Sequence, residues 1–249
     1  IIIQFQDKNG NHYQKIHPIK LNIYPKNALT WDNLNKLGSF ISLEDSLIIN
    51  FSRKAVSIIP ENIKLSKTLI QAIAIFQSLK NLKMKYVSDP KASYYAFHLD
   101  EAPIDYIQYP RETLRKKTGD CDDFTVLYAA MLESIGIQTA LIASPNHVFL
   151  MFKIPNLKSE RLISFQGEKW LPVELTYINK GFFQAWEKGF DLFMKFKKKV
   201  IKTTFEAMSE YPPVHFESPS NLFIPFQTFK IKKSIQNEIN NILKMLKIQ

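Results

Sequence analysis

The chain has 249 residues, of which 45% are apolar, and a formal net charge of +10. This length and apolar content allow one large hydrophobic core, with or without an appended piece. Nineteen Phe and ten Tyr exclude a disordered chain, and no apolar run approaches the roughly 20 residues that span a bilayer. The single cysteine excludes an intrachain disulfide and a multi-cysteine zinc cluster.

Lysines and acids are unevenly distributed along the chain. From residue 191 to the end there are ten Lys against five acids, whereas residues 100–123 hold seven acids against four basic residues. Basic side chains could bind nucleic acid, but the aromatic residues are not interleaved with Arg in a binding pattern, so we expect no nucleic-acid partner. The lysines between residues 195 and 202 are interpreted as a solvated helix face, with contact to an anionic membrane or polymer as the alternative.

The first 110 residues are predicted to form a small β element followed by helices. Residues 1–30 alternate apolar and polar positions around Asn9-Gly10, which is typical of a hairpin. Two short helical pieces are expected between residues 31 and 51, one of them opening at Ser42-x-x-Asp45. A long helix is expected from Pro60 to about residue 83, and the prolines of residues 84–110 predict a long irregular loop.

The only cysteine, Cys121, stands at the predicted start of a helix over residues 121–135, with Asp120 as its N-cap and Gly136 as its stop. Unpaired backbone N–H groups and the positive end of the helix dipole favour a thiolate here and could bind an oxyanion. On this stretch alone, a buried structural cysteine is an equally good interpretation, because free cysteine is among the most buried residue types.

Three β-like runs follow the cysteine helix, at residues 139–143, 147–153 and 170–176. A Pro145-Asn146 turn joins the first two, and the three runs can form an antiparallel sheet. Residues 182–209 are predicted to be a basic helix and residues 231–248 a final amphipathic helix.

Two of these runs carry side chains that could activate a thiol. A cysteine nucleophile needs a base, and the base needs an orienting acceptor. His147 lies at the entry of one run and Glu174 lies within another, so neighbouring antiparallel strands could bring them together. A carboxylate in an apolar strand needs a partner because an unpaired buried charge is costly, and His147 is the best candidate.

The candidate residues lie within or near five distinctive stretches: Tyr109-Pro110-x-x-Thr113-Leu114, Gly119-Asp120-Cys121-Asp122-Asp123, Gly136-Ile137-x-Thr139-Ala140, His147-Val148-Phe149 and Trp170-Leu171-Pro172-Val173-Glu174-Leu175-Thr176. In their order and residue types, these stretches resemble the bacterial transglutaminase-like cysteine hydrolases of the papain-like superfamily, over about residues 60–213. The resemblance implies Cys121 as nucleophile, His147 as general base and acid, and Glu174 as orienter, although the third position is more usually Asp in that family.

Four further residues are candidates for contact with the substrate. The backbone N–H of Cys121 is the first candidate oxyanion donor, and the Tyr86 hydroxyl is a second, with simple packing as its alternative. Asp122 and Asp123 could recognise an amine or a cationic residue of the substrate, although acids in a first turn also stabilise the helix dipole. Trp170 is the fourth candidate.

We therefore expect an α+β fold: a papain-like, transglutaminase-like core with a central nucleophile helix packed on an antiparallel β-sheet. Residues 1–55 are expected to form a small N-terminal extension, residues 56–215 the core, and residues 216–249 a C-terminal extension with an amphipathic helix.

The expected function is cysteine-dependent acyl transfer that hydrolyses peptide or isopeptide bonds in a peptide or protein substrate, without a cofactor or metal. The alternatives are a transamidating enzyme that cross-links proteins and a non-catalytic domain that binds peptides or mediates assembly. The chain opens on Ile1-Ile2-Ile3 without an initiator Met, so we expect a piece of a larger multidomain protein. We expect no membrane contact, and the resemblance alone favours the periplasm or the cell envelope.

Overall fold

The computed structural model describes residues 2–19, 21, 23–61, 63–88, 104–144, 147–217 and 224–247. The predicted Pro145-Asn146 turn and most of the predicted irregular loop lie outside these residues. The centre of the fold is a five-stranded sheet in the order β11-β7-β8-β10-β9, and all of its pairings are antiparallel. Its strands are β7 (Thr139–Ser144), β8 (His147–Lys153), β9 (Ile163–Phe165), β10 (Glu168–Val173) and β11 (Val200–Thr203).

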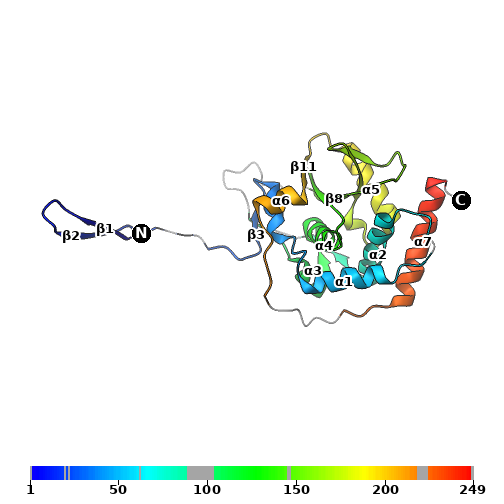
Figure 1. Ribbon diagram of the computed structural model, residues 1–249, viewed down its shortest axis with the longest axis horizontal. Helices are drawn as coiled ribbons and strands as arrows, with labels where there is room; N and C mark the ends of the chain where they lie inside the picture. The colour runs from blue at the N-terminus through cyan, green and yellow to red at the C-terminus, as the bar shows by residue number, and fades with distance from the viewer. Residues whose placement is uncertain are drawn as a thin grey trace.

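Helix α4 (Cys121–Glu133) packs on one face of this sheet, against β7 and β8. Every residue from Asp122 to Leu132 is buried, which leaves the helix surrounded on all sides (Figure 1). Its neighbours are α1 (Ser46–Ser57), α2 (Lys67–Asn81) and α3 (Pro110–Lys116). The structure therefore confirms the predicted α+β class with a central helix on an antiparallel sheet.

Helix α5 (Phe182–Lys195) covers part of the other face of the sheet. Its C-terminal half packs on a second hydrophobic cluster, which is separate from the main core. The cluster consists of Ala140, Ile142, Phe149, Met151, Ile163 and Trp170, with Phe190, Leu192, Phe193 and Phe196 against them. Gly189 permits the close approach, because a Cβ atom there would lie 2.8 Å from the carbonyl carbon of Pro172.

The predicted basic helix over residues 182–209 is wrong in its middle. The chain leaves α5 at Lys195, forms strand β11 at the edge of the sheet, and then enters helix α6 (Thr204–Glu210). Val200, Ile201 and Thr203 are β-branched and suit a strand, and Ile201 packs on the second hydrophobic cluster. Pairing with β7 thus outweighs the helical tendency that the lysine-rich sequence around β11 indicated.

Shorter elements complete the molecule. The long helix predicted from Pro60 begins instead at Lys67, directly after Ser66, a residue type favoured at helix N-caps. Within the predicted irregular loop, two strands pair with distant partners. The remaining elements are β3 (Ala28–Thr30), paired with β5 (Ile104–Tyr106); β4 (Lys85–Tyr86), paired in parallel with β6 (Thr118–Gly119); η1 (Leu34–Phe40); η3 (Leu175–Tyr177); and α7 (Thr228–Leu246).

The N-terminal hairpin stands apart from this body (Figure 1). It consists of β1 (Ile2–Gln6) and β2 (His12–Ile16), and all residues of both strands are exposed. The main hydrophobic core, in contrast, extends from Leu29 to Ile242 in one cluster. Segments that precede and follow residues 56–215 therefore pack on the same core, while the domain boundaries themselves stay a prediction.

Candidate active site

Cys121 is the first residue of α4 and is half-buried. Asp120 caps the helix in an extended conformation, and its carboxylate accepts a hydrogen bond from the backbone N–H of Asp123 at 3.4 Å. Asp123 accepts in return from the backbone N–H of Asp120 at 3.4 Å, which completes a reciprocal capping box. The Thr125 hydroxyl donates to the Cys121 carbonyl at 2.6 Å. These contacts fix the first turn that carries the thiol.

The sheet brings His147 and Glu174 together at one of its ends. His147 is the first residue of β8, and Glu174 follows the last residue of β10. The antiparallel register pairs Val173 with Leu150, which places the start of β8 beside the end of β10. His147 Nε2 lies 2.5 Å from Glu174 Oε2, and the Glu174 side chain is 1% exposed.

Further contacts orient this pair. The second Glu174 oxygen, Oε1, accepts from the backbone N–H of Thr176 at 2.9 Å. The His147 ring stacks on Phe149 at 5.8 Å between centroids. A carboxylate held at both oxygens and an imidazole held on one face have little freedom to turn, so the geometry of the pair is fixed before any substrate binds.

Cys121 lies beside the start of β8, the strand that carries His147. The backbone N–H of Val148, the residue after His147, is hydrogen-bonded to Cys121, and the Glu174 charge acts on the thiol. Burial first, and then the charges of Asp122 and Asp120, nevertheless raise the pKa of the Cys121 thiol well above its usual value. Burial thus opposes the thiolate form that was expected at a helix N-terminus.

The two acids that follow the cysteine point into the interior. Burial and the Asp120 charge raise the pKa of Asp123 to about 7. Gln108 donates to its carboxylate twice, from the backbone N–H at 2.7 Å and from the side-chain amide. Burial and a hydrogen bond with Asp120 raise the pKa of Asp122 well above its usual value. Both side chains are under 5% exposed, so they form the lining behind the thiol.

Tyr86 lies on the open side of the thiol. Strand β4 pairs in parallel with β6, which sets Tyr86 opposite Gly119, two residues before Cys121. Burial first, then the charges of Cys121 and Asp120, raise the pKa of the Tyr86 phenol. Its side chain is 47% exposed, so packing does not account for it. The structure brings this candidate to the site.

Trp170, in contrast, lies elsewhere. It pairs with Lys153 at the far end of β8 from His147, and its ring NH donates to the Phe165 carbonyl at 3.0 Å. Glu174 follows Trp170 by four positions along an extended chain, which corresponds to roughly 13 Å. It lines a cavity of about 420 Å³, together with Glu133, Thr204 and Phe205.

Sequence reasoning missed several residues that shape the site. Gln108 holds Asp123, Thr125 ties the first turn of α4, and Val148 contributes a backbone N–H to the thiol. The contacts of Gln108 and Val148 reach Asp123 and Cys121 across long stretches of chain, and a local sequence pattern does not report such contacts. The Thr125 contact spans one helical turn, and a threonine four residues after the nucleophile was its only signal.

One group among the described residues has the make-up of a metal-ligand set. It consists of the Asp120 and Asp122 carboxylates and the Cys121 thiol, whose ligand atoms lie within 4.8 Å of one another. The set contains the candidate nucleophile, and the positive end of the α4 dipole disfavours a cation there. We therefore interpret these two carboxylates as part of the surroundings of the thiol and not as metal ligands.

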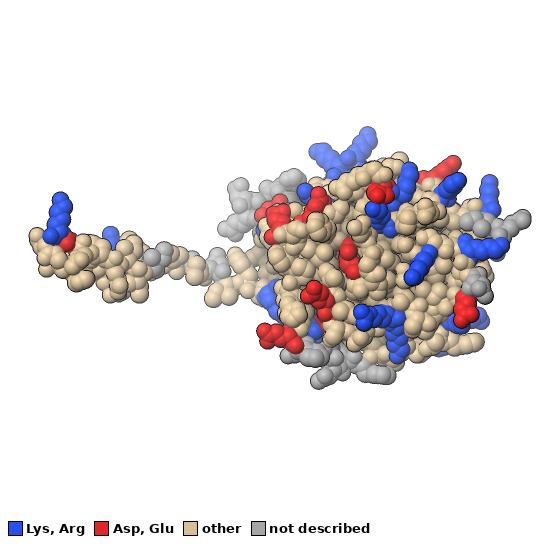
Figure 2. Space-filling view, in the orientation of Figure 1, with Lys and Arg blue, Asp and Glu red and all other residues tan. Residues whose placement is uncertain are grey.

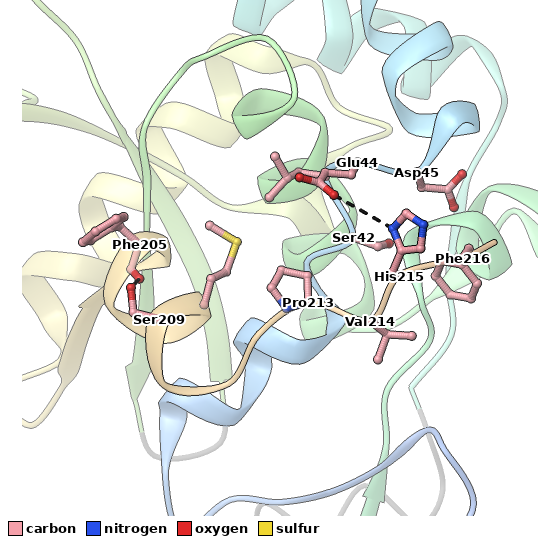
Figure 3. Close-up of a pocket in the computed structure, with 11 residues that line it drawn as sticks. Ser42, Glu44, Asp45, Phe205, Ser209, Pro213, Val214, His215 and Phe216 are labelled. Atoms are coloured by element: carbon pink, nitrogen blue, oxygen red, sulfur yellow. Dashed lines mark hydrogen bonds and ion pairs between the residues drawn. The ribbon is translucent and has the colours of Figure 1, made fainter.

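A further cavity of about 320 Å³ lies between the chain that precedes α1 and the chain that follows α6 (Figure 3). Glu44 and His215 face each other across it at 3.9 Å, and both side chains are largely exposed. Its lining includes none of Cys121, His147 and Glu174.

Within the described residues, no helix is both long and apolar enough to cross a bilayer.

Comparison with known proteins finds a family match for part of the chain. Residues 54–151 match the family model of a transglutaminase-like domain, and this stretch includes Cys121 and His147 while Glu174 lies outside it. No curated protein and no solved structure matches the chain. The match shows that residues 54–151 are similar to a transglutaminase-like domain, and it supports a papain-like cysteine enzyme family in general.

Proposed function

We propose that this protein is a cysteine-dependent acyl-transfer enzyme that hydrolyses peptide or isopeptide bonds. The observation that carries the proposal is the His147–Glu174 pair, 2.5 Å apart and next to the residue whose N–H meets the only thiol of the chain. Nucleophilic catalysis requires a nucleophile, a base and an acceptor that orients the base, and Cys121, His147 and Glu174 are the corresponding residues.

The raised thiol pKa defines how the reaction begins. Since Cys121 rests as a thiol, His147 acts as general base and takes its proton while Sγ attacks the substrate carbonyl carbon. Glu174 is bonded to Nε2 of His147, which leaves Nδ1 of the same ring to take the thiol proton. The Glu174 carboxylate then stabilises the imidazolium that forms. The imidazolium then protonates the leaving amine as the C–N bond breaks, and the acyl group remains on sulfur as a thioester.

Water completes the cycle. His147 takes a proton from water as the water oxygen attacks the thioester carbonyl, and the sulfur leaves with the proton returned by the imidazolium. The backbone N–H of Cys121 and the Tyr86 hydroxyl are the proposed donors to the oxyanion in both halves of the reaction. An amine in place of water would give transamidation with the same residues.

A non-catalytic binding domain is the second candidate, because a thiol with a raised pKa is a poor nucleophile without its base. Acylation by p-nitrophenyl acetate separates the two. We expect the wild type to release p-nitrophenolate and gain one acetyl group on Cys121 by intact mass. Cys121→Ala should lose this reaction, and His147→Gln should slow it roughly 10²- to 10⁴-fold. Acetylation of Cys121 at the wild-type rate in His147→Gln would favour the binding domain.

A further inference from the structure

Five lysines lie close together between α5 and α6. The lysine segment, defined here as residues 195–202, contains Lys195, Lys197, Lys198, Lys199 and Lys202, and no acid occurs between Asp191 and Glu206. It joins the end of α5 to the edge strand β11. Blue side chains project from the top edge of the molecule in Figure 2, where Figure 1 draws this connection.

The sheet places this segment beside the candidate active site. Val200, the first residue of β11, pairs with Ala143, and Ala143 pairs with Val148 on the next strand. Two strand spacings correspond to roughly 10 Å, so the lysines before Val200 flank the end of the sheet that holds His147. This arrangement depends on β11 being a strand, since a continuous helix would not follow the edge of β7.

The segment is also held in position. Lys199 Nζ donates to the Phe196 carbonyl at 2.8 Å and lies 4.3 Å from the centre of the Phe193 ring. Phe193 and Phe196 pack on the hydrophobic cluster that contains Phe149, whose ring stacks on His147. Anchoring the backbone in this way presents the remaining lysines at a defined place on the rim.

The positive charge of the segment is not neutralised from within. Lys195, Lys197 and Lys198 are exposed, and in the part of the chain that the structure describes no carboxylate lies within ion-pair distance of their ammonium groups. Clustered like charges repel one another and attract an anionic partner. Three neighbouring apolar side chains are exposed, Met194, Val200 and Phe205, against five lysines. This excess of charge favours an anionic chain in solution over insertion into a bilayer.

We infer that the lysine segment binds an acidic stretch of the protein substrate and so holds the bond to be cleaved beside Cys121. Only the second part of this inference, that the bond to be cleaved is held beside Cys121, rests on the proposed function. The binding of an acidic chain can be measured without any reaction, and the two halves are therefore tested separately.

The first test measures binding by fluorescence polarisation. Fluorescein-labelled octaglutamate should bind the full chain at least roughly tenfold more tightly than octaglutamine, and added salt should weaken this binding. The triple variant Lys197→Glu, Lys198→Glu and Lys199→Glu should lose the preference. The matched variant Lys230→Glu, Lys232→Glu and Lys233→Glu, with the same charge change on α7, should retain it.

The second test connects binding to the thiol. Two peptides with the same chloromethyl ketone, one rich in Glu and one rich in Gln, are compared by their rates of alkylating Cys121; the sulfur displaces chloride from the methylene carbon. The ratio of the two rates should be roughly ten in the wild type and in the α7 variant, and about one in the lysine-segment variant. Failure of both peptides to label Cys121 would count against the proposed function and leave the polarisation result standing.

Three results would overturn the inference: equal binding of octaglutamate and octaglutamine, retention of octaglutamate binding in the lysine-segment variant, or equal alkylation ratios in all three proteins. Vesicles of phosphatidylglycerol and phosphatidylcholine serve as a further probe. Vesicle binding that the lysine-segment variant abolishes, in the absence of any octaglutamate binding, would identify the surface as a membrane contact and contradict the inference.

Discussion

A glutamate lies at each end of helix α4, yet the surroundings of the two glutamates are chemically different. At the N-terminal end, Glu174 pairs with His147, an imidazole whose ring nitrogens can donate or accept a hydrogen bond. At the C-terminal end, Glu133 accepts hydrogen bonds from the backbone N–H of Thr139 at 2.6 Å, from its hydroxyl at 2.8 Å, and from the Thr204 hydroxyl. A backbone N–H and two threonine hydroxyls are not general bases, so we expect no proton transfer to a substrate at this end.

The comparison shows why a hydrogen-bonded carboxylate alone does not mark a site. Glu133 holds the end of α4, the start of β7 and the start of α6 together, and its pKa is raised by burial. Glu174 has one oxygen on backbone, as a structural residue would, and the other on a histidine next to a thiol. The partner of the carboxylate decides its role.

The largest expected difference between the two ends is in the reaction rate. Glu174→Gln should lower the rate of p-nitrophenyl acetate acylation roughly 10²- to 10⁴-fold, because an amide neither fixes the imidazole tautomer nor stabilises the imidazolium. Glu133→Gln is the matched control and should change the rate less than about twofold. A similar loss of rate in both variants would show that the comparison concerns stability alone.

The next largest effect concerns pH and the N-terminal end of α4. The pKa of Asp123 is raised to about 7 in the folded state, so the folded protein holds this proton more tightly than the unfolded chain. The stability from this group is present below about pH 4 and is lost as pH rises through 7. Between these limits the free energy of unfolding of the wild type should fall by at most about 4 kcal/mol through this group.

Urea unfolding at a series of pH values measures this dependence. In Asp123→Asn the decline of the unfolding free energy over that pH range should be smaller, since the group no longer titrates. A decline as steep as that of the wild type would mean that another group causes it.

A smaller effect on rate is expected at the open side of the thiol. Tyr86→Phe should lower the acylation rate about ten- to a hundredfold, less than is typical of a buried oxyanion donor, because Tyr86 is 47% exposed. Tyr106→Phe, which changes a tyrosine that is 42% exposed, should leave the rate unchanged. If the two variants have the same rate, the Tyr86 hydroxyl does not reach the oxyanion.

The smallest effect is expected at the C-terminal end of α4. Glu133→Gln should lower the free energy of unfolding by about 1 to 3 kcal/mol, because the amide nitrogen cannot accept the hydrogen bonds that the carboxylate accepts. Thermal unfolding followed by circular dichroism would measure the loss. An unchanged midpoint would show that Glu133 does not hold the three elements together.

Local patterns predicted much of this fold from the sequence. The α4 helix and strands β7, β8 and β10 have apolar periodicities that are complete within each segment, and the cost of burying Glu174 pointed to His147 as its partner. The predicted helix over residues 121–135 ends two residues early, at Glu133, and Gly136 adopts a positive φ of 82° in the turn that follows.

The remaining features depend on contacts between distant segments. The sequence of strand β11 lies in a lysine-rich stretch, and the strand forms because it can pair with the edge of β7. Tyr86 is brought to the first turn of α4 by a two-residue pairing with the segment that ends at Gly119, and Gln108 donates to Asp123 from another segment. Trp170 shares a sequence motif with Glu174, but the extended strand carries it to the other end of the sheet.

The central claim is that His147 and Glu174 act as one unit on Cys121, and a double-mutant cycle tests it most directly. The acylation rates of His147→Gln, Glu174→Gln and the double variant are compared with that of the wild type. If the residues act together, the double variant should be no slower than His147→Gln by more than about twofold, since the second change removes nothing further. Losses that multiply, so that the double variant shows the product of the two single effects, would contradict the account.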